Sequence, residues 1–129
     1  MPQYVNAMGG YLAQGRTAES AAIILADAKA LESAGAFGMV LEGVAEPLGA
    51  EITAAVSVLT IGIGASVSCD GQILVTEDML GLSGNRVPKF VKRYANLEND
   101  MRDAIQRYAD EVRSSKFPEP QHCFAVKKT

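Results

Sequence analysis

The sequence has 129 residues, of which 48% are hydrophobic and 21% charged, and its formal net charge is −3 at pH 7. These proportions are typical of a compact folded domain or part of one, and they exclude a disordered chain. The longest apolar runs fall far short of the roughly 20 residues that a bilayer-spanning helix needs, and the first ten residues do not have the pattern of a secretion signal. We therefore expect a cytoplasmic protein without a membrane partner.

Charge is unevenly distributed along the chain. Residues 1–85 carry two basic and nine acidic side chains, whereas residues 86–129 carry ten basic and six acidic ones. Four basic residues lie close together at the start of the second part: Arg86, Lys89, Lys92 and Arg93. They could hold a phosphate or a carboxylate, but the low sequence pI of about 5.1 argues against a nucleic-acid surface. A solvated face or a subunit contact is the commoner role of such a cluster.

The first predicted element is a helix that follows Thr17. Thr17 suits the N-cap position, apolar residues recur at helical spacing from Ala21 to Leu31, and Gly35 ends the pattern. The next run, residues 37–41, is too short for a helix and too apolar for a half-exposed strand. It predicts a parallel strand that is covered on both faces.

The alternation of helix and strand continues beyond this run. Residues 47–56 predict a short helix with a proline in its first turn, and residues 59–63 predict a second buried strand. A third apolar run, residues 72–75, follows after only about eight residues, although a parallel crossover normally needs a dozen or more. Spacing alone therefore leaves a hairpin open, within a pattern that is otherwise typical of a parallel α/β protein.

The last predicted element is an amphipathic helix over residues 98–114. Its apolar residues fall on one face at helical spacing. These residues are Met101, Ala104, Ile105, Tyr108 and Val112. Such a stripe indicates that this helix packs against another surface.

Glu42 is the main candidate for a functional residue, because it directly follows the predicted strand 37–41. In parallel α/β proteins ligands bind at the carboxyl ends of the strands. Position alone leaves two roles open for Glu42, a catalytic carboxylate and a structural acid that caps a helix or pairs with a neighbour. The glycine-rich residues 60–66 lack the dinucleotide-binding fingerprint, so their glycines are interpreted as permitting a tight turn and a close approach by a ligand or strand.

Five other residues have side chains that can bind metals, and each has a simpler interpretation. Glu77 and Asp78 follow a predicted strand and could bind a cation, but surface solvation is the commoner role of such a pair. His122 lies in a proline-rich tail without neighbouring ligands. Cys69 and Cys123 form neither a disulfide framework nor a paired-cysteine metal motif, which indicates reduced thiols.

Five segments occur in an order that resembles the ketopantoate hydroxymethyltransferase family. They are GGYLAQGR (9–16), LESAGAFGMVLEGV (31–44), IGIGAS (61–66), DGQILV (70–75) and VPKFVK (87–92). The resemblance covers nearly the whole chain and implies the C-terminal half of a (βα)8 TIM barrel, about strands six to eight with their helices. It therefore implies one partial α/β domain over residues 1–129. It also implies that the last two strands are adjacent and parallel, which argues against the hairpin.

The resemblance implies an activity in pantothenate biosynthesis. The family transfers a hydroxymethyl group from 5,10-methylenetetrahydrofolate to 3-methyl-2-oxobutanoate, giving 2-dehydropantoate, with Mg²⁺ bound by the keto acid. The family's proposed base ends the sixth strand in an apolar-apolar-Leu-Glu pattern, which falls on Glu42 in MVLEGV. The buried strand would hold this carboxylate in an apolar pocket, where carboxylates take up protons more readily.

The resemblance also indicates what this chain does not supply. The family's two magnesium-binding aspartates, a substrate-binding lysine and a histidine lie on the first five strands, upstream of the matching sequence. We therefore expect no metal ligands here, and no turnover by this chain alone. Ser66 stands where relatives usually have glycine, which we expect to stiffen or slightly distort its loop.

The family's assembly suggests partners for this chain. Family members form large homo-oligomers, often decamers, and residues 98–129 would provide a helix and tail for subunit contacts. The expected partners are the missing N-terminal half or further copies of the chain, together with the small keto acid substrate. The alternative to an enzyme is a catalytically silent, self-associating fragment or an interaction protein.

Overall fold

The computed structural model describes residues 12–84 and 87–125. The chain divides into two compact units. Unit 1 is Met1–Val75 with Pro88–Val91, and unit 2 is Thr76–Val87 with Lys92–Thr129. Among the described residues, no helix is long and apolar enough to cross a membrane.

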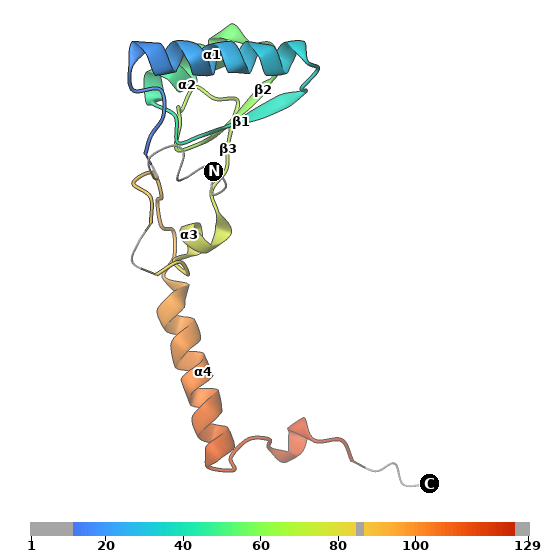
Figure 1. The fold of residues 1–129 in the computed structure, drawn as a ribbon. Helices are drawn as coiled ribbons and strands as arrows, with labels where there is room; N and C mark the ends of the chain where they lie inside the picture. Colours follow the sequence, from blue (N-terminus) through green and yellow to red (C-terminus); the bar gives the residue numbers. More distant parts are fainter. Residues whose placement is uncertain (1–11, 85–86, 126–129) are drawn as a thin grey trace. The chain divides into compact units, whose positions relative to one another are not determined.

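Unit 1 is a small parallel α/β layer structure (Figure 1). Its elements are α1 (Ala18–Ser33), β1 (Gly38–Glu42), α2 (Glu46–Ala55), β2 (Leu59–Ile63) and β3 (Gly71–Gln72). The strands lie in the order β1-β2-β3, and both pairs are parallel. The parallel pairing of β2 with β3 confirms the arrangement that the family resemblance implies and excludes the hairpin.

The two helices of unit 1 begin and end where the sequence predicts, within one or two residues. Thr17 caps α1 by accepting a hydrogen bond from the N–H of Ser20 (3.2 Å), and the Ser20 hydroxyl accepts one from the N–H of Thr17 (3.2 Å). This reciprocal capping box pairs two N–H groups that the first turn would otherwise leave without acceptors. Gly35, at φ +93°, follows the end of α1. Pro47 lies in the first turn of α2.

One face of the sheet packs against α1 and α2. The register pairs Met39 with Thr60 and Leu41 with Gly62, so these residues share a face. Leu41 belongs to the buried core and Met39 packs against it. On the same face the Thr60 hydroxyl lies 3.0 Å from the Thr53 hydroxyl of α2. Among the described residues, the buried core consists of Ala28, Leu41, Val44, Leu48, Ile52 and Cys69.

The opposite face of the sheet corrects the prediction of strands covered on both faces. Val40 in β1 and Leu59 in β2 are 57% and 60% exposed, and Phe37, just before β1, is 92% exposed. Each strand therefore alternates between a covered and an uncovered face, because the described helices of unit 1 supply a layer on one side only. The predicted strand 72–75 is also wrong beyond Gln72, since Ile73 and Val75 are 51% and 47% exposed outside β3.

The connection from β2 to β3 is a loop of bends with one turn and contains no helix, which explains its short length. Gly71 pairs with Ile61, so the chain needs to return only two residues along the sheet, roughly 7 Å, before it pairs again. Asp70 fixes this return by accepting hydrogen bonds from the backbone N–H (2.8 Å) and the hydroxyl (2.9 Å) of the fully buried Thr60. The Thr60 N–H and then its hydroxyl hold the pKa of Asp70 below its ordinary value.

Unit 2 contains α3 (Thr76–Leu80), α4 (Leu97–Arg113) and the short 3₁₀ helix η2 (Pro120–His122). Backbone hydrogen bonds from Tyr94 to Met79 (2.8 Å) and from Glu98 to Gly81 (3.3 Å) join the start of α4 to the α3 region. The helix predicted over residues 98–114 is thus confirmed to within one residue. None of its residues is buried, so the apolar stripe is formed but has no covering layer among the described residues.

Candidate functional site

The candidate site is the edge of the sheet at the carboxyl ends of β1 and β2. Glu42 and Ile63 are the last residues of these strands and pair with each other. The N–H of Gly43 donates to the carbonyl of Ile63 (2.9 Å), which extends the ladder by one bond. Gly43 and Gly64 then both have positive φ angles, +61° and +65°. Glycine permits this conformation at little cost, so the chain turns away from the sheet immediately after the end of each of these two strands.

Two further segments reach the same edge. The N–H of Gln14 donates to the carbonyl of Gly43 (2.7 Å), and the N–H of Ala45 donates to the carbonyl of Gln14 (2.9 Å). The ring of Phe90 lies against Gly64, where an added Cβ would come within 2.3 Å of it. The edge is thus built from four parts of the chain that are far apart in sequence.

The side chain of Glu42 is exposed at this edge. By alternation along β1 it lies on the same face as Val40, which α1 and α2 leave uncovered. The described part of the chain therefore does not enclose this carboxylate in the apolar pocket that we expected. Glu42 is positioned by the ladder and by the turn at Gly43, with its side chain directed away from the helix-covered core.

The loop after β2 is tied to the beginning of α2. Ser66 is 2% exposed, and its hydroxyl donates to Glu46 Oε1 (2.9 Å) while accepting from the N–H of Ser68 (3.1 Å). The Gln72 side-chain amide donates to the Ser66 carbonyl (2.7 Å). Ser66 is outside the left-handed backbone region and its hydroxyl both donates and accepts a hydrogen bond, so the residue fits this loop without backbone strain, and the expected stiffening stays a prediction.

The side chains that could bind metals do not converge. Within residues 12–84 and 87–125 there is no group of three or more His, Cys, Asp or Glu side chains that could hold a metal ion. Glu77 and Asp78 lie in the first turn of α3. His122 accepts a hydrogen bond at Nδ1 from the N–H of Glu119 (3.2 Å).

The structure places the two cysteines and three residues of the basic cluster. Cys69 is buried in the core of unit 1, Cys123 is exposed, and both are free thiols. Arg86 lies outside the described residues. Lys92 Nζ lies 4.9 Å from the centre of the Tyr94 ring, and Arg93 donates to the carbonyl of Gly84. Lys89 is exposed.

Comparison with known sequences identifies the family. A sequence model described as ketopantoate hydroxymethyltransferase matches residues 1–120. The chain belongs to the ketopantoate hydroxymethyltransferase family. It is 58% identical over 126 residues to 3-methyl-2-oxobutanoate hydroxymethyltransferase of Bordetella petrii, 52% over 128 residues to 3-methyl-2-oxobutanoate hydroxymethyltransferase 1 of Pseudomonas aeruginosa, and 49% over 128 residues to the Clostridioides difficile enzyme.

These alignments cover 98% to 99% of this chain but only 46% to 47% of each relative. The chain therefore spans about half the length of the relatives that it matches. The segments that carry the ketopantoate hydroxymethyltransferase resemblance are also the ones that meet in unit 1. Gln14, Gly43, Gly64 and Phe90 each come from a different one, while the fifth segment supplies β3. Sequence reasoning did not name Gln14 or Phe90, although both lie within segments that it recognised.

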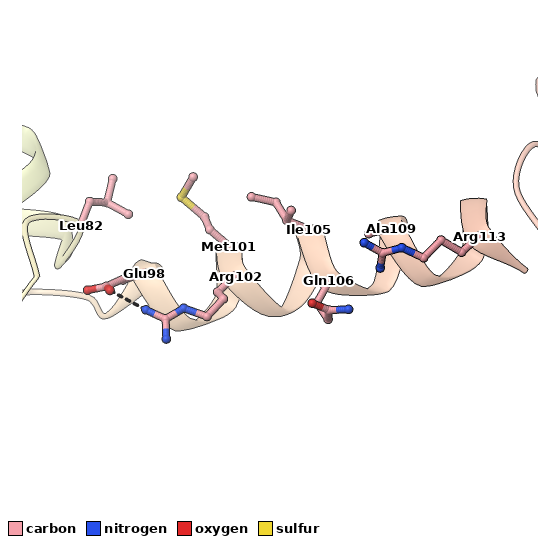
Figure 2. A pocket seen from close by; sticks show the side chains of 8 residues that line it. All are labelled: Leu82, Glu98, Met101, Arg102, Ile105, Gln106, Ala109 and Arg113. Atoms are coloured by element: carbon pink, nitrogen blue, oxygen red, sulfur yellow. Dashed lines mark hydrogen bonds and ion pairs between the residues drawn. The ribbon is translucent and has the colours of Figure 1, made fainter.

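A shallow groove lies on α4 of this family member (Figure 2). Leu82, Met101 and Ile105 point to one side of the helix, and Glu98 and Arg102 form an ion pair (2.7 Å) beside them. The remaining lining residues are Gln106, Ala109 and Arg113. The groove has an apolar floor and one exposed (i, i+4) ion pair, which suits packing against another surface better than catalysis.

Proposed function

We propose that this chain is the base-bearing half of a 3-methyl-2-oxobutanoate hydroxymethyltransferase, with Glu42 as the general base. The observation that carries the proposal is the place of Glu42, at the carboxyl end of a parallel strand where four family segments meet. Family membership supports the reaction class, and the 58% identity to the Bordetella petrii enzyme supports the substrates.

The chemistry assigned to Glu42 is proton removal. The carbon beside the keto group of 3-methyl-2-oxobutanoate carries one acidic proton, and the Glu42 carboxylate accepts it when the substrate lies within about 3 Å. The resulting enolate forms a carbon–carbon bond to the one-carbon unit of 5,10-methylenetetrahydrofolate. The two carbon–nitrogen bonds of the methylene carbon break as this bond forms and as water supplies the hydroxyl oxygen. The protons taken from the substrate and from water pass to the two nitrogens, so tetrahydrofolate leaves and 2-dehydropantoate is the product. Glu42 needs a site that excludes bulk water, and its exposure in this chain calls for a covering partner.

The described residues contain no group of three or more potential metal ligands, and no step is assigned to a metal held by this chain. The proposal instead places the magnesium ligands in the portion of the enzyme that the relatives have and this chain does not match. The three parallel strands would form strands six to eight of an eight-stranded barrel. Val40 and Leu59 would then face the barrel interior, because they lie on the face opposite α1 and α2.

The proposed partner is therefore the other half of the barrel, and the second candidate is a further copy of this chain. The second candidate rests on α4, whose apolar residues Met101, Ile105 and Tyr108 are 51%, 64% and 56% exposed. A helix with such a stripe gains stability by covering it. Self-association through α4 would also suit the alternative function, a catalytically silent interaction protein.

The functional test is turnover with and without the complementary half. The purified chain with Mg²⁺, 5,10-methylenetetrahydrofolate and 3-methyl-2-oxobutanoate should give no 2-dehydropantoate above background. Adding the part of the Bordetella petrii enzyme that this chain does not match should restore turnover. In that complex Glu42→Gln keeps the shape and removes the base, so turnover should fall by about two to four orders of magnitude while substrate binding survives.

Glu19→Gln is the matched control, because Glu19 is also exposed and lies in the first turn of α1. It should leave turnover unchanged. Turnover by the chain alone would show that the metal site is wrongly assigned. Near-normal turnover by Glu42→Gln would show that Glu42 is a structural acid.

The partner proposal has a separate test in sedimentation velocity at micromolar concentration. Uncovered apolar residues on β1, β2 and α4 predict species larger than the 13.7 kDa chain. Equimolar complementary half should convert them to one defined complex. A single folded species near 13.7 kDa that binds no hydrophobic dye would contradict the proposal.

A further inference from the structure

The hydrogen bond between Ser66 and Glu46 connects the two loops that leave the candidate site. Glu46 is the first residue of α2, four positions after Glu42, and Ser66 lies three positions after the end of β2. Ser66 Oγ lies 2.9 Å from Glu46 Oε1. An ionised carboxylate only accepts hydrogen bonds, so the Ser66 hydroxyl must be the donor. The bond therefore joins the loop after β1 to the loop after β2 at one fixed distance.

The surroundings of Ser66 make this contact specific. The hydroxyl is buried and also accepts from the N–H of Ser68 (3.1 Å), so both of its hydrogen-bonding functions are used. Gly49 on α2 lies against Ser66, where an added Cβ would come within 2.9 Å of the Ser66 Cβ. The missing side chain at Gly49 thus lets the loop approach α2 closely enough for the bond to form.

The strand ends provide a second connection, directly after Glu42. The N–H of Gly43 bonds to the carbonyl of Ile63 (2.9 Å), directly after the Glu42–Ile63 pair. Two cross-connections therefore follow Glu42 within four residues, one at Gly43 and one at Glu46. Both join the β1 side of the site to the β2 side.

We propose that Glu46 and Ser66 are positioning residues that hold the loop after β1, and with it Glu42, in register with the loop after β2. This inference rests on the proposed role of Glu42. A general base must be held within a fraction of an ångström of its working position, and hydrogen-bonded supporting residues provide that restraint. Neither residue touches the substrate in this account; each acts through the loops.

The test removes the Glu46–Ser66 hydrogen bond by a substitution in one loop and measures amide hydrogen exchange in the other loop. Ser66→Ala removes the donor, and amide hydrogen exchange is then followed at Gly43 and Ala45, on the β1 side. Glu46→Ala removes the acceptor, and exchange is followed at Cys69 and Ile73, whose N–H groups bond to Ser66 and Gly62. The full chain is used, in the assembly in which it is purified.

Exchange should become roughly tenfold faster in the opposite loop in both variants, since a hydrogen bond to a charged group contributes at least that factor. Glu46→Gln retains an acceptor oxygen and should restore most of the protection. Glu19→Ala, the same residue type in the first turn of α1, should leave both loops unchanged. Faster exchange confined to the mutated loop would overturn the proposal, and so would a uniform rise that extends through α1.

Kinetics of the complex with the complementary half provide the second measurement. Ser66→Ala and Glu46→Ala should lower kcat about tenfold while KM changes less than about twofold, because substrate contacts are intact. Unchanged kcat in both variants would overturn the positioning role. No turnover by the unsubstituted complex would instead contradict the proposed function, and the exchange measurements would still decide whether the pair couples the loops.

Discussion

Unit 1 and α4 differ in how far their apolar residues are buried. In unit 1, α1 and α2 pack on one face of the sheet, and Ala28, Leu48 and Ile52 are between 0% and 4% exposed. In α4 the apolar stripe is regular, but Ile105 is 64% exposed and no residue of the helix is buried. Amphipathic spacing therefore marks the face that should be covered, and only a second layer determines whether it is.

The uncovered face of the sheet resembles α4, because its apolar residues are also exposed. Val40 and Leu59 alternate with buried neighbours in the same strands and are still more than half exposed. Parallel sheets occur almost only with both faces covered. Among its described residues, unit 1 thus has a helix layer on one side of the sheet and none on the other.

The strongest test of the comparison removes the same side chain from each region. Ile52→Ala should lower the free energy of unfolding by about 2–5 kcal/mol, because it leaves a cavity in a packed core. Ile105→Ala should change it by less than about 0.5 kcal/mol, since this side chain is mostly exposed. Urea unfolding of both variants measures the difference. Equal losses would show that α4 is covered in solution.

A second test compares two glycines with similar backbone angles. Gly64 and Gly84 have φ angles of +65° and +70°, but the Phe90 ring blocks a Cβ at Gly64 and nothing lies within 4 Å at Gly84. Gly84→Ala should cost about 1 kcal/mol for the left-handed conformation alone. Gly64→Ala should cost about 2–4 kcal/mol because the ring must also move. Equal costs from thermal unfolding would mean that Phe90 does not pack on the strand end.

The smallest effect is expected in a third test, which compares how the stability of two Asp→Asn variants depends on pH. Hydrogen bonds from Thr60 lower the pKa of Asp70, so its contribution to stability is present above the unfolded pKa and is lost as pH falls through the folded value. Asp70→Asn should therefore lower the melting temperature by a few degrees at pH 7 and by less below about pH 4. Asp110→Asn on α4 is the control.

Asp110 pairs with Arg113 at an exposed position (3.2 Å), and such surface pairs contribute about 0–1 kcal/mol. Its variant should therefore melt close to the unsubstituted chain at pH 7. If Asp70→Asn lowered the melting temperature equally at all pH values, the result would contradict the role given to the ionised carboxylate.

The sequence predicted the elements of unit 1 better than their surroundings. Local signals were sufficient for α1, where Thr17 caps and Gly35 follows the end, and for the strand that ends at Glu42. The parallel pairing of β2 with β3 came from family resemblance, since the rule on crossover length assumes a connecting helix. Here the connection is a short loop without a helix, and it is held by the Asp70–Thr60 bonds, which periodicity does not encode.

Burial was harder to predict than secondary structure. An apolar run such as residues 37–41 indicates a strand with two faces to cover, but it does not say whether this chain supplies both layers. The place of Glu42 at the strand end was predicted, whereas the approach of Gln14 and Phe90 depends on long-range contacts. The Glu46–Ser66 bond likewise joins residues 20 positions apart and has no local signal.

The Asp70–Thr60 contact has a consequence for the order in which the chain folds. It joins residues 10 positions apart, whereas the β1–β2 ladder joins residues such as Val40 and Ile61 across a whole helix. Closing the shorter loop costs less chain entropy, and contacts between near neighbours in sequence form sooner. We therefore expect the β2–β3 turn to be the folding nucleus of unit 1. It would provide an edge to which β1 can pair before α1 and α2 pack on the sheet.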